Sequence, residues 1–254
     1  MIEVHGLTDR GRKRQSNEDS IGLDPAIGLA VVADGMGGHQ SGEVASNLAV
    51  QALQEFIVRA HRDRDLTWPF GFDPARSFEA NCLATGIKLA NQAVFLASAS
   101  HPDLAGMGTT VIAVLARTGQ LSYAGVGDSR AYLLRGDAFR RLTRDDSWLE
   151  AALAQKLIDI DEADDHPLRH VLTKAVGLQA DVEFDVGEEA LQDGDRVLLC
   201  SDGLTSAVSD PQIREILHAR NADLAAACRA LVAAANDAGG PDNVTVVLVR
   251  QTGR

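Results

Sequence analysis

The chain has 254 residues and 45% of them are hydrophobic, so it can bury a sizeable core. Acidic residues outnumber basic ones by 36 to 24, the formal net charge is −12, and no Lys- or Arg-rich tract offsets it. This charge argues against nucleic acid or an anionic membrane as a partner, whereas carboxylates can gather around cations. No secretory signal stands near the start, and no stretch approaches the roughly 20 apolar residues that span a bilayer. We therefore expect a soluble, cytoplasmic monomer with a single domain, residues 1–254.

The first hundred residues predict strands followed by two long helices. Short apolar runs at Ile2–Leu7 and Leu29–Ala33, separated by a polar segment, are typical of strands joined by loops. From Ser41 to about His61, apolar residues recur at steps of three and four, and the same spacing returns over Leu83–Ala97. That period predicts two amphipathic helices.

The remainder of the chain predicts a β-meander, then further strands and helices. The expected strands are 109–116, 120–126, 131–134, 138–142, 182–186, 196–200 and 244–249. The expected helices are 147–157, 210–219 and 222–238. Blocks of strands interrupted by pairs of helices favour an α+β layered fold over a strictly alternating parallel one.

Several aspartates stand beside the ends of predicted strands: Asp34, Asp128, Asp202 and Asp242. Burying these carboxylates is costly unless something neutralises them, and divalent cations do so most directly. Oxygen ligands without a His or Cys cluster indicate Mg²⁺ or Mn²⁺ rather than zinc. Gly35 would let its backbone carbonyl approach such an ion. Each aspartate alone also fits a turn or cap, and it is the repetition at strand ends that favours a metal centre.

A polar loop near the N-terminus adds a second chemical group. It places Arg14 close to the carboxylate pair Glu18 and Asp19. A guanidinium beside carboxylates suits a phosphate clamp next to metal-held water. A solvated surface charge cluster is the alternative interpretation.

Eight segments in order carry a resemblance. They are Arg14–Asp19, Val32–His39, Gly42–Ser46, Gly108–Thr110, Gly127–Tyr132, Leu142–Ser147, Ser201–Leu204 and Gly240–Thr245. Together they resemble the successive motifs of the bacterial PPM (type 2C) serine/threonine phosphatases, and the resemblance extends from Asp9 to Val249. It implies a four-layer α-β-β-α sandwich, with two central antiparallel sheets flanked by helices and a metal centre in the cleft at one edge.

The resemblance also implies a role for each acidic residue in the metal centre. Asp34 would bridge two ions, Mn²⁺ or Mg²⁺, and the carbonyl of Gly35 would join the second. Asp202 and Asp242 would complete the first ion's ligands. Asp128 matches a position that helps to bind a third ion together with Asp202.

The implied reaction is hydrolysis of phosphoserine and phosphothreonine by metal-activated water, without a phosphoenzyme intermediate. Its substrates would be phosphoproteins made by an opposing serine/threonine kinase. Arg14 would bind the phosphoryl oxygens, while Glu18 and Asp19 would bind or orient metal-held waters. The leaving oxygen would take a proton either from such a water or from an imidazole, for which His39 is the candidate. His39 also fits a role in structuring its loop.

One segment departs from the family pattern. Many bacterial members have Asp-His-Ser where this chain has Asp145-Asp146-Ser147, at the start of a stretch, about 145–175, that corresponds to the family's flap. Ser147 is a candidate substrate contact. His166 and His170 lie four residues apart but lack a third ligand at matching spacing, so we expect a packing or surface role for them.

Two other functions stay open. Metal and arginine recognise phosphate rather than peptide, so a phosphatase of small phosphomonoesters is one alternative. A catalytically inactive sensor that binds phosphoproteins is the other, and it is disfavoured because every expected ligand is present. No Cys is followed six positions later by Arg, and no Gly-Lys-Ser/Thr closes a P-loop, so two other phosphate chemistries lack their signatures.

Overall fold

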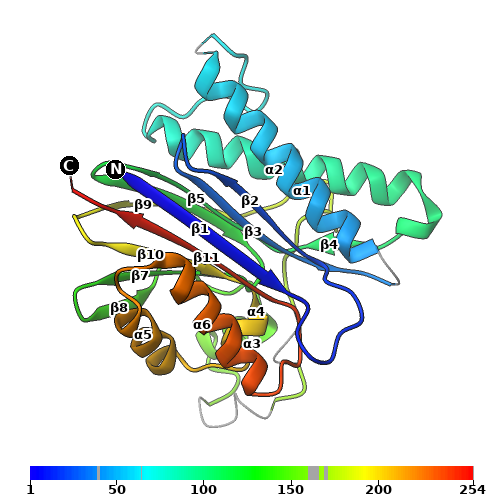
Figure 1. Ribbon diagram of the computed structural model, residues 1–254. Coiled ribbons are helices and arrows are strands. Elements are labelled where there is room, and N and C mark those ends of the chain that lie inside the picture. The colour runs from blue at the N-terminus through cyan, green and yellow to red at the C-terminus, as the bar shows by residue number, and fades with distance from the viewer. Residues whose placement is uncertain (39–40, 64, 160–165, 169–170, 254) are drawn as a thin grey trace.

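The computed structural model describes residues 1–38, 41–63, 65–159, 166–168 and 171–253. Its centre is a pair of antiparallel sheets packed face to face (Figure 1). The five-stranded sheet has the order β1 (Ile2–Asp9), β11 (Val244–Gln251), β10 (Arg196–Cys200), β7 (Arg130–Arg135) and β8 (Ala138–Arg141). The other sheet has the order β2 (Asp19–Asp24), β3 (Leu29–Met36), β5 (Val111–Arg117), β6 (Gln120–Val126) and β9 (Asp185–Ala190), and β4 (Gly108–Thr109) pairs with β3.

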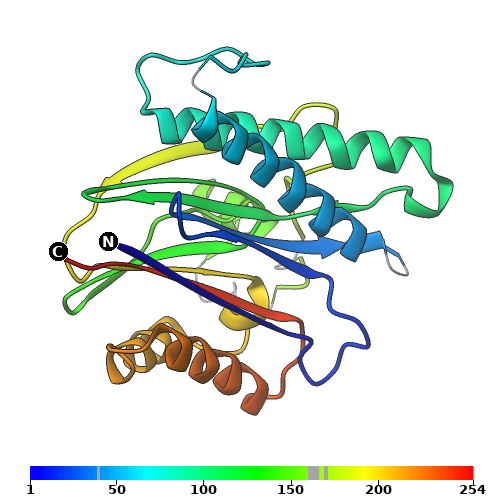
Figure 2. The same ribbon diagram turned by 45° about the horizontal axis from the view of Figure 1, so that its top comes forward.

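Helices cover the outer face of each sheet and complete four layers (Figure 2). The long helices α1 (Ser41–Arg62) and α2 (Phe78–Ser100) pack on the sheet that contains β3. The helices α5 (Asp210–Ala219) and α6 (Leu224–Asp237) pack on the sheet that contains β11. Three short helices complete the fold: η1 (Pro102–Leu104), α3 (Trp148–Ala154) and α4 (Asp202–Thr205). The predicted α-β-β-α sandwich is confirmed.

Strand β5 shows why the central strands read as continuous apolar runs. Alternate residues of a strand point to opposite faces. Val111, Ala113 and Leu115 pack with the helices α1 and α2, whereas Ile112 and Val114 pack between the two sheets. All five are fully buried, because both faces of this strand are covered.

The prediction missed β2 and the short helices η1 and α4, misplaced β9, and joined β4 and β5 into one strand, 109–116. Strand β2 was not predicted, because only Ile21 and Leu23 are large apolar residues in its six positions. Strand β9 begins at Asp185 rather than Val182. Pairing with β6 sets its position, because its glutamate-rich sequence has little strand propensity of its own. Helix α4 was also missed, since a single turn leaves no periodic signal.

Helix α2 corrects the prediction that no segment is long and apolar enough to cross a membrane. Among the described residues it is the one helix that meets that test by length and composition. Its fully buried residues include Leu83, Ile87, Ala90 and Val94, which pack in the same core cluster as residues of α1 and of the sheet. Its apolar character is therefore that of a core helix.

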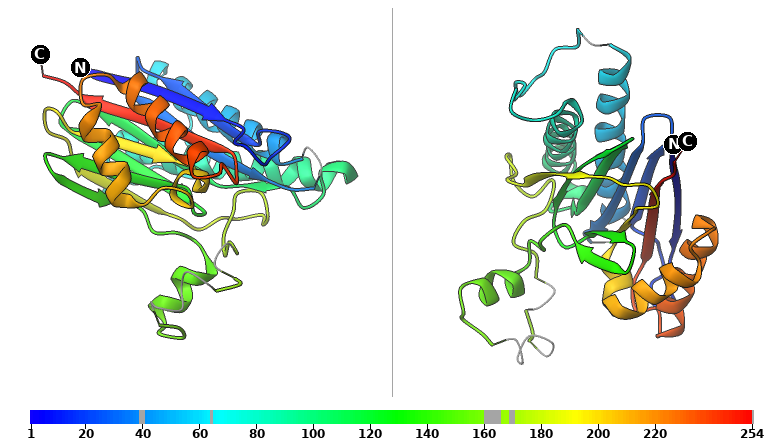
Figure 3. Two further views of the ribbon diagram at one scale, coloured as in Figure 1. Left: turned by 60° about the horizontal axis from the view of Figure 1, so that its bottom comes forward. Right: turned by 90° about the vertical axis from the view of Figure 1, so that its left-hand side faces the viewer.

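The segment that carries α3 extends away from the sandwich (Figure 3). Ser147 caps α3 by accepting a hydrogen bond from the Glu150 amide at 3.2 Å. Trp148 stacks on His166, with ring centroids 4.3 Å apart and an interplanar angle of 18°. His166 therefore has the packing role that was expected, while His170 lies outside the described residues.

Candidate active site

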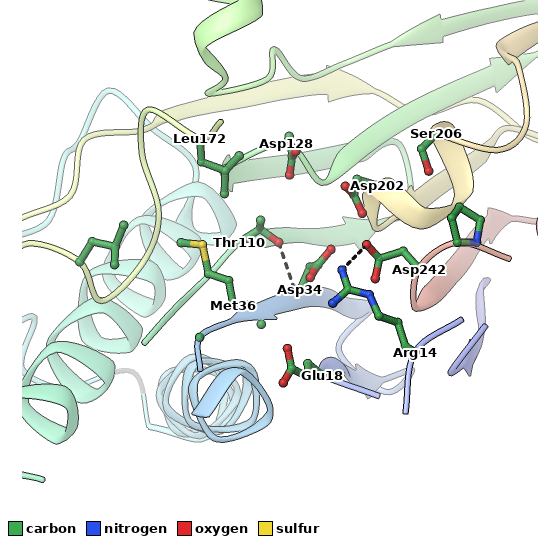
Figure 4. A pocket seen from close by; sticks show the side chains of 14 residues that line it. Arg14, Glu18, Asp34, Met36, Thr110, Asp128, Leu172, Asp202, Ser206 and Asp242 are labelled. Carbon is green, nitrogen blue, oxygen red and sulfur yellow. Dashed lines mark hydrogen bonds and ion pairs between the residues drawn. The ribbon is translucent and has the colours of Figure 1, made fainter. Parts of the chain in front are cut away.

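A pocket of about 690 Å³ opens where β3, the turn between β6 and β7, helix α4 and the loop before β11 come together (Figure 4). Its walls contain most of the predicted site residues: Arg14, Glu18, Asp34, Gly35, Asp128, Asp202 and Asp242. They also contain residues for which no role was predicted: Met36, Gly37, Thr110, Leu172, Leu178, Ser206 and Pro241. The volume lies in the range of small-molecule sites in proteins.

Asp19 lies behind this pocket, next to Asp34. The two aspartates are direct partners across the antiparallel pair β2 and β3. One carboxylate oxygen of Asp19, Oδ2, accepts hydrogen bonds from Ser201 Oγ at 2.8 Å and from Thr245 Oγ1 at 2.6 Å. The other, Oδ1, is buried and accepts none from the described residues. Burial raises the pKa of Asp19 to about 6. A buried carboxylate oxygen without a partner is costly, and it fits a site that receives a cation or its bound water.

Negative charge concentrates around Asp34. Burial and the nearby carboxylates of Asp19, Asp202 and Asp128 raise the pKa of Asp34 well above its usual value. Burial, together with Asp202 and Asp145, raises the pKa of Asp128 to about 7. Carboxylates arranged in this way repel one another, and a divalent cation would relieve the repulsion.

The carboxylates surround a space rather than touching one another. In the described part of the chain, no three His, Cys, Asp or Glu side chains converge closely enough to form a complete metal site by themselves. A cation between them would keep water among its ligands, as Mg²⁺ usually does. The donor set is oxygen only, so it suits Mg²⁺ or Mn²⁺.

Two glycines allow the pocket walls to approach closely. A Cβ at Gly35 would lie 2.0 Å from the carbonyl oxygen of Gly42 and 2.7 Å from that of Glu18. A Cβ at Gly203 would lie 1.9 Å from the carbonyl oxygen of Asn243. Only glycine fits at either position without a backbone shift. These contacts fix the end of β3 against α1 and fix α4 against the loop before β11.

Asn243 holds the N-terminal loop that contributes Arg14 and Glu18. Its Oδ1 accepts from the Glu18 amide at 2.8 Å, and its Nδ2 donates to the carbonyls of Arg10 and Ser16 at 2.9 Å each. This buried side chain was part of a quoted motif, but no role was predicted for it. No sequence pattern signals this role, because only the structure shows that Asn243 is buried and must therefore place its amide in hydrogen bonds.

Arg14 lies on the pocket wall and pairs with Asp242. Its Nη2 is 2.7 Å from Asp242 Oδ2, and 52% of the arginine side chain is exposed. This ion pair raises the pKa of Arg14, which stays charged. The guanidinium therefore faces the pocket as a fixed positive group between carboxylates (Figure 4).

The turn that carries Asp128 is anchored by Asp145 and by Asp146, the residue that departs from the family pattern. Asp146 accepts from the Gly127 amide at 3.2 Å, and its own amide donates to the Gly127 carbonyl at 2.8 Å. Arg130 donates to both carboxylate oxygens of Asp145, with Nη2 at 2.7 Å from Oδ2. Both aspartates thus tie the start of the segment 145–175 to the pocket.

Of the predicted site residues that the structure describes, Asp19 and Ser147 do not line the pocket. Ser147 caps α3 instead, so its contact with substrate stays a prediction. His39 lies outside the described residues, so its role as a proton donor also stays a prediction.

Comparison with known proteins assigns the chain to a family. Residues 8–239 match the model of the family described as protein phosphatase 2C. The serine/threonine phosphatase Stp of Listeria innocua is 37% identical over 251 residues, which cover 96% of this chain and 94% of that protein. PstP of Mycobacterium tuberculosis is 38% identical over 98% of this chain and 45% of its own length.

Solved structures also match this chain and agree with the family assignment. The crystal structure of Mycobacterium tuberculosis PstP matches with a TM-score of 0.85 and 35% identity over 99% of both chains. A structure of the PstP catalytic domain in complex with 2 manganese ions matches with a TM-score of 0.83 and 34% identity, again over 99% of both chains. The chain belongs to the protein phosphatase 2C family of metal-dependent serine/threonine protein phosphatases.

Proposed function

We propose that this pocket hydrolyses phosphoserine and phosphothreonine in proteins, using two Mn²⁺ or Mg²⁺ ions and no phosphoenzyme intermediate. The observation that carries the proposal is the group of carboxylates with raised pKa values around Asp34, beside the buried, unpartnered Oδ1 of Asp19. When bound, the ions supply a water molecule whose pKa is lowered enough for it to attack phosphorus near neutral pH.

Each aspartate would be a ligand of a particular ion or pair of ions. Asp34 would bridge the two ions, and the Gly35 carbonyl would serve the second. Asp202 and Asp242 would serve the first. Asp128 would share a third ion with Asp202, and both residues line the same pocket. The manganese-bound PstP structure supports a two-ion centre in a chain of this fold.

Arg14 and the acidic pair near it act on substrate and water. The Arg14 guanidinium would bind two phosphoryl oxygens and balance the charge that develops on them during attack. Its ion pair with Asp242 holds it at the edge of the pocket. Glu18, in the pocket wall, and Asp19, behind it, would orient the water molecules around the ions. His39 is retained as a candidate proton donor to the leaving oxygen.

The two alternatives differ from this proposal in what they bind or turn over. A phosphatase of small phosphomonoesters would use the same metals and arginine but would gain nothing from the residues beyond the pocket. A sensor would bind phosphoproteins without hydrolysing them. Family membership and the presence of all the expected ligands favour the protein phosphatase.

The cellular setting is part of the proposal. The substrates would be phosphoproteins made by a serine/threonine kinase, and the enzyme would act as a cytoplasmic monomer. The three cysteines, all free and buried, fit a reducing compartment. Gel filtration with light scattering would test the monomer, and cell fractionation would test the location.

The experiment that tests the activity is hydrolysis of a phosphothreonine peptide with Mn²⁺, with Mg²⁺ and with EDTA. Asp202→Asn is the matched variant, because it removes one ligand charge while keeping the size of the side chain. We expect phosphate release that depends on metal and is lost in the variant, whose circular dichroism spectrum should be unchanged. Folded wild-type protein that releases no phosphate with either metal would support the sensor instead.

A further inference from the structure

A second pocket adjoins the active site. It has a volume of about 370 Å³ and is called the lateral pocket here. Its lining residues are Thr173, Lys174, Ala175, Leu178, Gln179, Asp181, Val182 and Glu183. Leu178 also lines the active-site pocket, so the two pockets meet at this side chain, which is 47% exposed. A chain bound in the active site can therefore continue over Leu178 into the lateral pocket.

Hydrogen bonds from helix α2 hold the segment on either side of Leu178. Asn91, a residue of α2 that is 1% exposed, donates from Nδ2 to the carbonyls of Gln179 and Ala180 at 3.0 Å each. Its Oδ1 accepts from the Gly177 amide at 2.8 Å. A buried side chain thus fixes both flanks of an exposed leucine. An apolar side chain held exposed in one place suits contact with a ligand, because little ordering is needed on binding.

Acidic side chains outnumber basic ones in the lining of the lateral pocket. Asp181 and Glu183 both line it, and neither has an ion pair or a side-chain hydrogen bond with another described residue. Lys174, the basic residue in the lining, is already engaged by Asp146, with Nζ 3.4 Å from Oδ1. Val182 and Leu178 supply apolar surface beside these carboxylates. The lining therefore combines an apolar wall, two acidic groups and one lysine that already contacts Asp146.

We infer that the lateral pocket binds a lysine or arginine side chain of the phosphoprotein substrate, close in sequence to the phosphorylated residue. The aliphatic stem would pack on Leu178 and Val182, and the cationic end would lie beside Asp181 and Glu183. The inference rests on the proposed function, because it assigns part of the substrate's sequence to a surface next to the same active site. It makes the two acidic residues determinants of specificity.

The test is a set of phosphothreonine peptides of neutral sequence in which one lysine is moved through the positions on either side of the phosphothreonine. For each peptide, kcat/KM is measured with Mn²⁺ and divided by the value for the all-alanine peptide. We expect the wild-type protein to prefer lysine roughly threefold to tenfold at one position or at two adjacent ones. The ratio cancels any difference in folded fraction or metal content between protein samples.

Variants assign the preference to the two carboxylates. Combining Asp181→Asn with Glu183→Gln should bring the ratio close to one. Replacing both residues by lysine should reverse the preference, so that peptides with glutamate at the same position react faster. Asp185→Asn is the matched control, since Asp185 is exposed in the same stretch of chain but does not line the lateral pocket. This control should keep the wild-type ratio.

The outcomes separate the two proposals. Wild-type protein that hydrolyses the alanine peptide but shows no preference for lysine at any position would overturn the inference alone. The same would follow if the double variant kept the preference, because the attraction would then arise from the general negative charge of the protein. Absence of hydrolysis with every peptide would overturn the proposed function and the inference with it.

Discussion

The carboxyl of Asp128 makes the metal-free protein less stable as the pH rises. Burial and the neighbouring carboxylates raise its pKa from 3.8 to about 7. The native state therefore holds this proton more tightly than the unfolded chain does. Its contribution to stability is present at low pH and is lost as the pH rises from about 4 through 7. When the group is fully ionised, the loss amounts to about 4 kcal/mol.

Asp128→Asn keeps the size of the side chain and removes this charge. In EDTA, the variant should be more stable than the wild-type protein, and its advantage should be about 2 kcal/mol larger at pH 8 than at pH 5.5. Urea unfolding followed by circular dichroism measures both values. Mn²⁺ should shrink the advantage at pH 8, because a cation relieves the wild-type carboxylate. An advantage that does not change with pH, or a wild-type protein that is the more stable at pH 8 in EDTA, would refute the reasoning.

Three further substitutions test the walls of the site. Arg14→Ala should weaken inhibition by free phosphate about tenfold without weakening Mn²⁺ binding measured by calorimetry, because the guanidinium contacts phosphate and not the ions. Equal inhibition would show that another group holds phosphate. Asn243→Ala removes three hydrogen bonds to the N-terminal loop and should lower the free energy of unfolding by about 3 kcal/mol in a urea titration. A loss below about 0.5 kcal/mol would mean that the loop is held by other contacts. Gly35→Ala places a Cβ 2.0 Å from the Gly42 carbonyl oxygen and should lower both Tm and kcat, whereas unchanged values would show that the backbone can shift at no cost.

Elements with strong local signals could be predicted to the residue. Helix α5 has the predicted bounds because Ser209 and Gln212 form a capping box at its start. Strand β10 also has the predicted bounds, since an apolar run follows the turn at Gly194. Strands β2 and β9 could not be placed in this way, because pairing with β3 and β6 defines them more than their own residues do.

The candidate site also has some features that the local sequence predicts and others that depend on contacts between distant segments. The motifs identified the acidic residues and Arg14, because each stands next to a turn or strand end in a recognisable pattern. They could not show that Arg14 pairs with Asp242, which is 228 residues away in the sequence. They also gave no indication that Ser201 and Thr245 occupy only one oxygen of Asp19. Such contacts depend on the pairing of distant strands, which the motifs do not describe.

The position of β11 has a consequence for biosynthesis. This strand lies between β1 and β10, yet it follows every other strand in the chain. The ribosome therefore delivers Asp242 and Thr245 after all the other strands have been made. Until β11 inserts, β1 has no partner in its sheet, and Asp19 lacks the Thr245 hydroxyl. A nascent chain in which β11 has not yet emerged from the ribosome therefore lacks part of the acidic pocket, and we expect it to be inactive until this strand has inserted.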